Sequence, residues 1–375
     1  MLGKDFEMVE RQKSKRVVTF GEVMCRFCPP DCLRFGQVSP GPWQMTFGGA
    51  ESNVAASVAL FGGSAEFVTA LPEHQIANAC VRQLSSLGIK IGNILRLATG
   101  RMGIYFVERG VNQRASQVIY DRDYSSFSEV VPATFDWGVI FQGASWFHTT
   151  GITAALSEGA AAAACHAAKT AKEQGLTVSV DLNFRAKLWN WRKGYSAEKL
   201  AQEIMPELLK YADVVIGNEE DAHKMLGIKA ADTDVESGHI NTSGFAAVAQ
   251  EIMSRFPNVG MVATTLRESI SATHNNWGAI LSVRGKQPVL APLKHDEYKP
   301  YEIHAIVDRV GGGDAFAGAL IFALNSGEFG NEQSALNFAA AASCLAHSIS
   351  GDFNFVTRSE VERLAAGDGN GRVQR

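Results

Sequence analysis

Short apolar runs alternate with helix-like segments along most of the chain. The first run, Val17-Val18-Thr19-Phe20, ends at Gly21. Comparable runs lie at 65–70, 145–149, 176–180, 214–217 and 260–263. Apolar residues recur at helical spacing at 50–61, 73–87 and 156–174. Such alternation predicts βαβ units around a mostly parallel central sheet flanked by helices, which is an α/β fold.

Two regions interrupt this alternation, at 22–47 and 93–120. Both contain β-forming residues with Pro and Gly, and neither has a good helical pattern. We expect them to form a small β-rich layer that covers a site on the α/β body as a lid. The body then comprises 16–21, 48–92 and 121–365.

The composition is typical of a globular protein. Of its 375 residues, 46% are apolar and 20% are charged, and the formal net charge is -4. This balance favours neither a nucleic acid nor an anionic membrane as partner. No run approaches the roughly 18 apolar residues of a membrane span, and the polar N-terminus lacks the apolar core of a signal peptide. We therefore expect a cytoplasmic protein, and we expect it to be a homo-oligomer.

Four polar or cysteine-containing stretches carry further expectations. The stretch 229–243 predicts a loop or insertion, and the ends 1–15 and 367–375 are expected to be flexible. Cys25, Cys28 and Cys32 form a CxxC followed by a third cysteine. A structural zinc site needs a fourth ligand, and no His or Cys lies near them in the sequence. We interpret them as reduced thiols in a strand and a turn. 

A glycine-rich turn precedes a strongly apolar helical segment. Gly311-Gly312-Gly313 is followed by Asp314 and by an apolar run at 315–324. Glycines allow a tight turn that directs backbone N–H groups at one point, and a helix N-terminus favours an anion there. We interpret the turn as an anion hole for a phosphoryl group and Asp314 as the base that deprotonates the attacking hydroxyl. A glycine-rich turn capped by an aspartate explains the local pattern equally well.

Other phosphate-binding motifs do not occur, since the sequence has no P-loop, no GxGxxG and no kinase HRD or DFG. Residues 308–314 match DxxGxGD at the start of a late helix, and residues 48–53 match GGxxxN, ending at Asn53. Together they resemble the two signatures of the ribokinase-like (PfkB) carbohydrate kinases, in the family's order and at its separation. The resemblance covers about residues 16–365. It implies a ribokinase-like fold with a β-rich lid, ATP with Mg²⁺, and a monovalent cation as a further cofactor.

Several stretches resemble the 2-keto-3-deoxygluconate kinases (2-dehydro-3-deoxygluconokinases) within that family. They are Gly48–Glu51, Gly103–Tyr105, Tyr120–Arg122, His148–Ile152 and Val180–Trp189. The resemblance implies ATP-dependent phosphorylation of the terminal hydroxyl of 2-keto-3-deoxygluconate, with Asp314 as general base. It also implies a set of residues that bind the sugar acid, namely Gly49, Asn53, Tyr105, Tyr120, Arg122, Arg185 and Asp352.

The residue types suit a sugar acid independently of the family. Arg122 and Arg185 each offer a planar fork of donors to a carboxylate. Tyr105 and Tyr120 each offer an apolar face and a hydroxyl to the carbon chain. Taken singly, an arginine in such a layer more often forms a surface ion pair, and a tyrosine in a strand more often fills a core.

The segment Asn218-Glu219-Glu220-Asp221 departs from the family pattern NxxE, which organises contacts to Mg²⁺ and phosphate. Its last position is Asp, which is one methylene shorter. We expect Asn218 at the nucleotide, and Glu219, Glu220 or Asp221 at the metal, directly or through water. Acids in the first turn of a helix, where they complement its dipole, explain the segment equally well.

A second departure lies at 264–278, where many relatives carry a Lys/Gly-rich turn. Thr265 and Arg267 are expected to contact phosphates there, together with Gly311 and Gly313. The pocket for the purine base must then be built differently from that of these relatives. We expect Trp277 to be part of the apolar core.

Two other functions fit the same motifs. One is a ribokinase-like kinase of a neutral sugar or nucleoside, for which two arginines in the pocket have no purpose. The other is a catalytically inactive sensor that binds a sugar acid or a nucleotide. Loss of Asp314 or of its glycines would mark such a sensor, and all of them are present.

Overall fold

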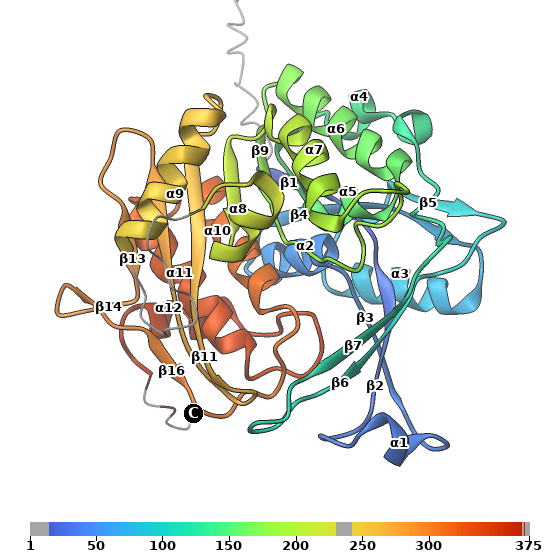
Figure 1. Cartoon of the computed structure of the whole chain (residues 1–375), viewed down its shortest axis with the longest axis horizontal. Helices are drawn as coiled ribbons and strands as arrows, with labels where there is room; N and C mark the ends of the chain where they lie inside the picture. Colours follow the sequence, from blue (N-terminus) through green and yellow to red (C-terminus); the bar gives the residue numbers. More distant parts are fainter. Residues whose placement is uncertain (1–14, 230–241, 370, 372–375) are drawn as a thin grey trace, which may run out of the picture.

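The computed structural model describes residues 15–229, 242–369 and 371, with the side chain of Glu219 excluded. The predicted N-terminal tail up to residue 14, most of the polar stretch 229–243, and the C-terminal residues 370 and 372–375 therefore lie outside the described residues. In the part of the chain that is described, no helix is long and apolar enough to cross a membrane. Figure 1 shows a large α/β body from which a small layer of strands projects.

A ten-stranded sheet forms the centre of the body. Its order is β13 (Val289–Ala291), β12 (His274–Val283), β11 (Met261–Ser271), β10 (Val214–Gly217), β9 (Thr177–Asp181), β8 (Ala144–Thr150), β1 (Arg16–Phe20), β4 (Ser64–Pro72) and β5 (Ile94–Leu97), with β16 (Tyr301–Ile303) also paired to β12. From β11 to β5 every neighbouring pair is parallel, whereas β12 runs antiparallel to its partners. The predicted mostly parallel α/β fold is confirmed.

Helices cover both faces of this sheet, and each face has its own apolar core. One core contains residues of α4 (Trp137–Ile140), α5 (Gly151–Leu156), α6 (Glu158–Glu173), α7 (Ala197–Leu209), α8 (Glu219–Leu226) and α9 (Thr242–Arg255). The other contains residues of α2 (Ala50–Leu60), α3 (Gln75–Ser86), α10 (Gly312–Ser326), α11 (Glu332–Ala346) and α12 (Arg358–Ala365). Val18 belongs to the first core and Val17 to the second, because successive side chains of a strand point to opposite faces. 

The predicted helix at 156–174 corresponds to α6, and a separate short helix, α5, precedes it. The side chain of Ser157 accepts a hydrogen bond from the backbone N–H of Ala160 at 3.0 Å, so α6 starts at Glu158 and α5 ends at Leu156. The alanine-rich face of α6 packs against the sheet, and small side chains there allow a close approach of helix and sheet.

The lid is a separate four-stranded sheet with the order β3 (Gln44–Gly48), β2 (Met24–Cys28), β6 (Ile104–Glu108) and β7 (Gln117–Asp121). It includes one short helix, α1 (Phe35–Val38), which the sequence did not suggest. The expected range 93–120 begins too early, because residues 94–97 form β5 and pair with β4 in the body sheet. Strand β5 lacks a following helix, so its four residues were indistinguishable from a lid strand in the sequence.

Candidate active site

A cavity of about 460 Å³ lies between the lid and the carboxyl ends of the parallel strands. Its walls come from β6 and β7, from the loops after β9 and β10, and from the N-terminal ends of α2 and α10. Sheets of this kind bind ligands at that edge. The cavity is lined by nearly all of the site residues expected from the sequence, namely Gly49, Asn53, Tyr105, Tyr120, Arg122, Arg185, Asn218, Glu220, Asp221, Thr265, Arg267, Gly311, Gly312, Gly313, Asp314 and Asp352.

Two glycines of the turn are required by the fold. Gly311 has a φ of 85°, and a Cβ there would lie 2.4 Å from the backbone oxygen of Asp352. A Cβ on Gly312 would lie 2.9 Å from the imidazole of His347. The third glycine differs, because nothing lies within 4 Å of a Cβ built on Gly313, which faces the cavity.

The start of α10 offers unpaired N–H groups to the cavity. The first backbone hydrogen bond of this helix runs from Ala315 N to Gly311 O at 2.8 Å. The amides of Gly312, Gly313 and Asp314 precede it, so helix geometry gives them no carbonyl partner. This arrangement suits an anion such as a phosphoryl group.

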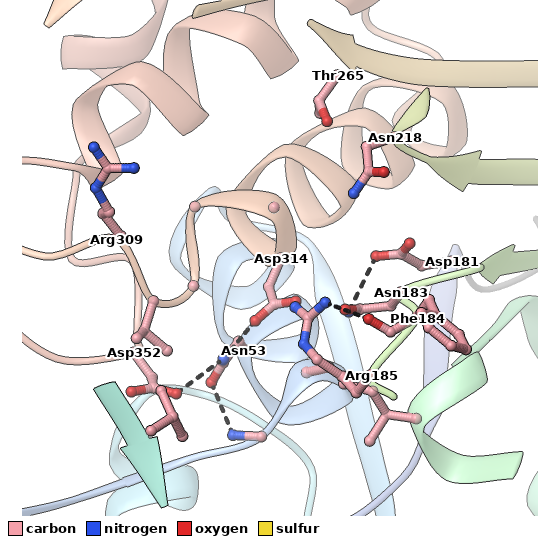
Figure 2. A pocket seen from close by; sticks show the side chains of 18 of the residues that line it. Asn53, Asp181, Asn183, Phe184, Arg185, Asn218, Thr265, Arg309, Asp314 and Asp352 are labelled. Atoms are coloured by element: carbon pink, nitrogen blue, oxygen red, sulfur yellow. Dashed lines mark hydrogen bonds between the residues drawn. The ribbon is translucent and has the colours of Figure 1, made fainter. Parts of the chain in front are cut away.

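Asp314 lies in the first turn of α10 and points at Asn53 (Figure 2). Its Oδ2 accepts a hydrogen bond from Asn53 Nδ2 at 2.7 Å. The helix cap is Gly311, without a side-chain cap, so Asp314 is not the N-capping aspartate of the alternative explanation. Burial raises the pKa of Asp314 to about 7; the hydrogen bond from Asn53 lowers it, the charge of Asp352 raises it and that of Arg185 lowers it. A carboxyl group with such a pKa suits a general base at neutral pH.

Gly48 and Gly49 allow close contacts of other residues with the chain at the start of α2. A Cβ on Gly49 would lie 2.0 Å from the backbone oxygen of Glu22, and one on Gly48 would lie 2.2 Å from Oδ2 of Asp352. This motif is therefore also a packing requirement. It brings Asn53, one turn into α2, within reach of Asp314.

Asp352 is buried and already has protein partners. Tyr105 donates its hydroxyl to Asp352 Oδ2 at 2.6 Å, and Arg26 donates Nη1 to Oδ1 at 2.7 Å. Burial raises the pKa of Asp352, while both of these partners lower it. The tyrosine predicted to bind the sugar is thus tied to the aspartate predicted to bind it.

Arg122 has a partner that the sequence did not suggest. Glu22, two residues after the end of β1, accepts a hydrogen bond from Arg122 Nε at 2.7 Å and forms an ion pair with its Nη2. Both side chains are buried and line the cavity. The guanidinium also lies 5.6 Å from the ring centroid of Tyr120, a cation–π distance. Since Glu22 occupies one edge of the fork, the Nη1–Nη2 edge is left for a second carboxylate.

Arg185 interacts electrostatically with a different group of acidic side chains. Its Nη1 donates to the carbonyl of Phe184 at 2.9 Å, and Figure 2 shows the guanidinium beside Asp314. The charge of Arg185 lowers the pKa of Asp314 and also that of Asp181, a buried carboxyl group whose pKa is raised by burial. The two arginines that the sequence grouped therefore have different electrostatic partners, Arg122 with Glu22 and Arg185 with the acids around the base.

Residues 218–221 form the start of α8. The helix N-terminus that was the alternative explanation of this segment is therefore present. Asn218 Oδ1 accepts from the N–H groups of Glu220 and Asp221 at 2.9 and 3.0 Å. Asp221 Oδ2 accepts from Asn218 N at 3.1 Å, and its Oδ1 accepts from Phe184 N at 2.9 Å. Asp221 thus joins α8 to the loop that carries Arg185. Glu219, the remaining predicted metal ligand, has its side chain outside the described residues.

A long β-hairpin forms the other end of the cavity. Thr265 and Arg267 lie on β11 and line it. Arg309, from the DxxGxGD motif, donates to Ala272 O at 2.7 Å and to Asn275 Oδ1 at 2.9 Å, which fixes the motif against the hairpin. 

Trp277, on the partner strand β12, is buried as expected and packs edge-on against His347, with ring centroids 4.9 Å apart. It nevertheless contributes to the cavity wall. This end of the cavity is therefore both cationic and aromatic.

Four charged residues that line the cavity were not assigned a role from the sequence, namely Glu22, Glu51, Asp181 and Arg309. Neither was Arg26, which pairs with Asp352. Glu22 and Asp181 each stand at the carboxyl end of a predicted strand, a position that could have marked them. Glu51 accepts hydrogen bonds from the hydroxyls of Thr150 and Thr153, both at 2.7 Å. Arg26 lies within a lid strand and gave no signal.

The sheet order, the lid and a carboxylate at an open helix N-terminus define a ribokinase-like small-molecule kinase. A family model described as pfkB family carbohydrate kinase matches residues 14–356, and the chain belongs to that family. It is therefore a carbohydrate kinase.

Similar proteins narrow the class further. The structure of 2-dehydro-3-deoxygluconokinase from Thermotoga maritima has a TM-score of 0.84 and 44% identity, covering 94% of this chain and 99% of that one. The 2-dehydro-3-deoxygalactonokinase of Haloferax volcanii is 30% identical, over 94% of this chain and 96% of its own length. A structure titled a putative 2-keto-3-deoxygluconate kinase from Enterococcus faecalis has a TM-score of 0.82 and 26% identity, covering 96% of this chain and 99% of that one.

Proposed function

We propose that this kinase transfers the γ-phosphoryl group of ATP to the terminal hydroxyl of 2-keto-3-deoxygluconate, giving 2-keto-3-deoxy-6-phosphogluconate. The observation that carries the proposal is the buried guanidinium of Arg122. Glu22 pairs with one edge of it, which leaves the Nη1–Nη2 edge for a substrate carboxylate in the cavity that also contains Asp314. A neutral sugar has no group that needs this edge. The names of the similar proteins point to the same class of substrate. The expected cytoplasmic location and homo-oligomeric state rest on the sequence alone.

In the proposed reaction, Asp314 accepts the proton of the attacking hydroxyl. Asn53 holds this carboxylate through its Nδ2, 2.7 Å from Oδ2. The unpaired amides at the start of α10 bind the phosphoryl oxygens, where negative charge must be stabilised during transfer. Arg122 holds the acid end of the substrate, and this binding energy orients the distant hydroxyl for attack.

Kinases of this family use ATP with a divalent metal. The donors present fit Mg²⁺ carried by the triphosphate: Glu220 is exposed at the cavity, whereas both oxygens of Asp221 accept backbone N–H groups. Among the residues described, no group of three or more His, Cys, Asp or Glu could hold a metal, and Mg²⁺ commonly relies on one or two carboxylates, phosphates and water. When bound, Mg²⁺ would neutralise phosphate charge. A monovalent cation, which the family resemblance implies, is a further cofactor in this proposal.

A coupled ADP-release assay with ATP and Mg²⁺ tests this function. Its substrates are 2-keto-3-deoxygluconate, its C4 epimer 2-keto-3-deoxygalactonate, and neutral sugars such as fructose and ribose. We expect kcat/KM to be highest for 2-keto-3-deoxygluconate. Preference for the epimer would reassign the sugar acid, and equal turnover of acids and neutral sugars would contradict the sugar-acid class. Binding of a sugar acid without ADP release would indicate the sensor.

A mutation in the predicted carboxylate site should change substrate preference. Arg122→Met leaves Glu22 buried without its partner, so the matched variant is Glu22→Gln/Arg122→Met, which removes both charges. We expect the double variant to lose about ten- to a hundredfold in kcat/KM for the acid, since a charge-assisted hydrogen bond is worth about 1.5–3 kcal/mol. Slow turnover of a neutral analogue should hardly change. If kcat/KM falls equally for both substrates, Arg122 does not bind the carboxylate.

The lid is expected to close when the sugar binds. Tyr105, Tyr120 and Arg122 belong to the lid or follow it directly, whereas Asp314 belongs to the body. A site made of two parts must bring them together, and closure also excludes water as a competing acceptor. Amide hydrogen exchange of β2, β3, β6 and β7 should slow on adding the sugar acid. Unchanged exchange at saturating substrate would indicate a preformed, rigid site.

A further inference from the structure

A buried arginine joins the lid to the catalytic end of the body. Arg26 is the central residue of β2 and is only 2% exposed. The strand register places it beside Thr46 of β3 and Tyr105 of β6. It is among the largest fully buried side chains of the residues that the structure describes. A buried guanidinium is costly unless it is fully paired.

The guanidinium bridges two aspartates that lie far from it in sequence. Nη1 donates to Asp352 Oδ1 at 2.7 Å, and Nη2 forms an ion pair with Asp308 Oδ2. Both carboxylates are buried. Tyr105 donates to the other oxygen of Asp352 at 2.6 Å. Two neighbouring lid strands thus hold the same aspartate.

Each aspartate also forms a hydrogen bond with a different part of the proposed catalytic site. Asp308 opens the DxxGxGD motif, and its Oδ1 accepts from the N–H of Val310 at 3.1 Å, immediately before the glycine turn. Asp352 accepts from Asn53 Nδ2 at 3.5 Å, and the same Nδ2 bonds Asp314 at 2.7 Å. In Figure 2 Asn53 lies between these two aspartates.

Charge balance makes Arg26 more than a packing residue. Asp308 and Asp352 are two buried acids, and both form ion pairs with Arg26. Without that positive charge, two carboxylates would face each other beside the site for an anionic phosphoryl group. The carbonyl of Asp352 also packs against Gly311, so a shift of Asp352 would displace the turn.

We infer that Arg26 is a positioning residue that holds the lid, the general base and the anion turn in register, and that supplies a fixed positive charge beneath the turn. This inference rests on the proposed roles of Asp314 and the turn, but it does not depend on which carbohydrate is phosphorylated. It assigns a role in phosphoryl transfer to a residue outside both family signatures.

The test compares Arg26→Lys and Arg26→Met with a control in the full-length enzyme. The carbohydrate is any one that the wild type phosphorylates, so a wrong sugar-acid assignment does not affect the result. Lysine keeps the charge but cannot bond both aspartates as a fork. We expect Arg26→Lys to lose about 100-fold in kcat, as misplaced catalytic groups do, with the KM for ATP little changed. Arg101→Lys, which changes an exposed arginine bonded to Asp121 at 2.7 Å, should behave as the wild type.

Chemical rescue separates positioning from packing. In Arg26→Met, millimolar guanidinium chloride should restore part of kcat, and an equal concentration of sodium chloride should not. If Arg26→Met fails to fold, the lysine variant decides. An Arg26→Lys enzyme with wild-type kcat would overturn the inference, and so would an Arg26→Lys enzyme whose melting temperature falls while kcat at permissive temperature is unchanged.

Discussion

Replacing Asp314 by Asn should lower kcat about 10²–10⁴-fold, the usual contribution of positioned acid–base catalysis. The amide has nearly the same shape and can keep a hydrogen bond to Asn53, so the fold and nucleotide binding should persist. Steady-state kinetics, nucleotide titration and the melting temperature provide the three measurements. Activity within a few fold of the wild type would remove Asp314 from the role of base.

The pH profile offers an independent check on the same residue. Burial raises the pKa of Asp314 to about 7, and only the deprotonated carboxylate can accept a proton. The kcat/KM of the wild type should therefore fall as pH falls through about 7. The residual activity of Asp314→Asn should not show this fall in kcat/KM. If kcat/KM of the wild type instead fell near the ordinary pKa of an aspartate, another group would limit the rate.

Replacing Gly313 by Val should abolish most turnover without unfolding the protein. A Cβ at this position meets no protein atom within 4 Å, so the body has room for the side chain. The branched side chain instead enters the cavity, where the amides at the start of α10 must contact the phosphoryl group. We expect kcat to collapse while circular dichroism and melting temperature stay near those of the wild type.

Gly311→Ala is the matched control, because it should fail for the opposite reason. Its Cβ would lie 2.4 Å from the carbonyl oxygen of Asp352, at a φ of 85° that disfavours a side chain. This variant should lose stability as well as activity. An active Gly313→Val enzyme would place the anion site elsewhere on the protein.

The sequence by itself determined the architecture and most of the site. Strands with β-branched runs and helices with apolar periodicity are local signals, because each element buries its own face. The glycine turn and Asp314 were also visible locally, since a turn that exposes N–H groups and a carboxylate must be adjacent in the chain. Residues 94–97 were misassigned to the lid because a four-residue strand carries the same local pattern in either sheet.

Only the tertiary structure decided which charges meet. Arg26 and Asp352 are separated by 326 residues and Arg122 and Glu22 by 100, and no local pattern links either pair. The ion pair with Glu22 changes Arg122 from a free fork into one with a single available edge. Arg185, which looks equivalent in sequence, instead lies near the base. Burial and distance set pKa values and partners, and these follow from how distant segments pack rather than from the residue types alone.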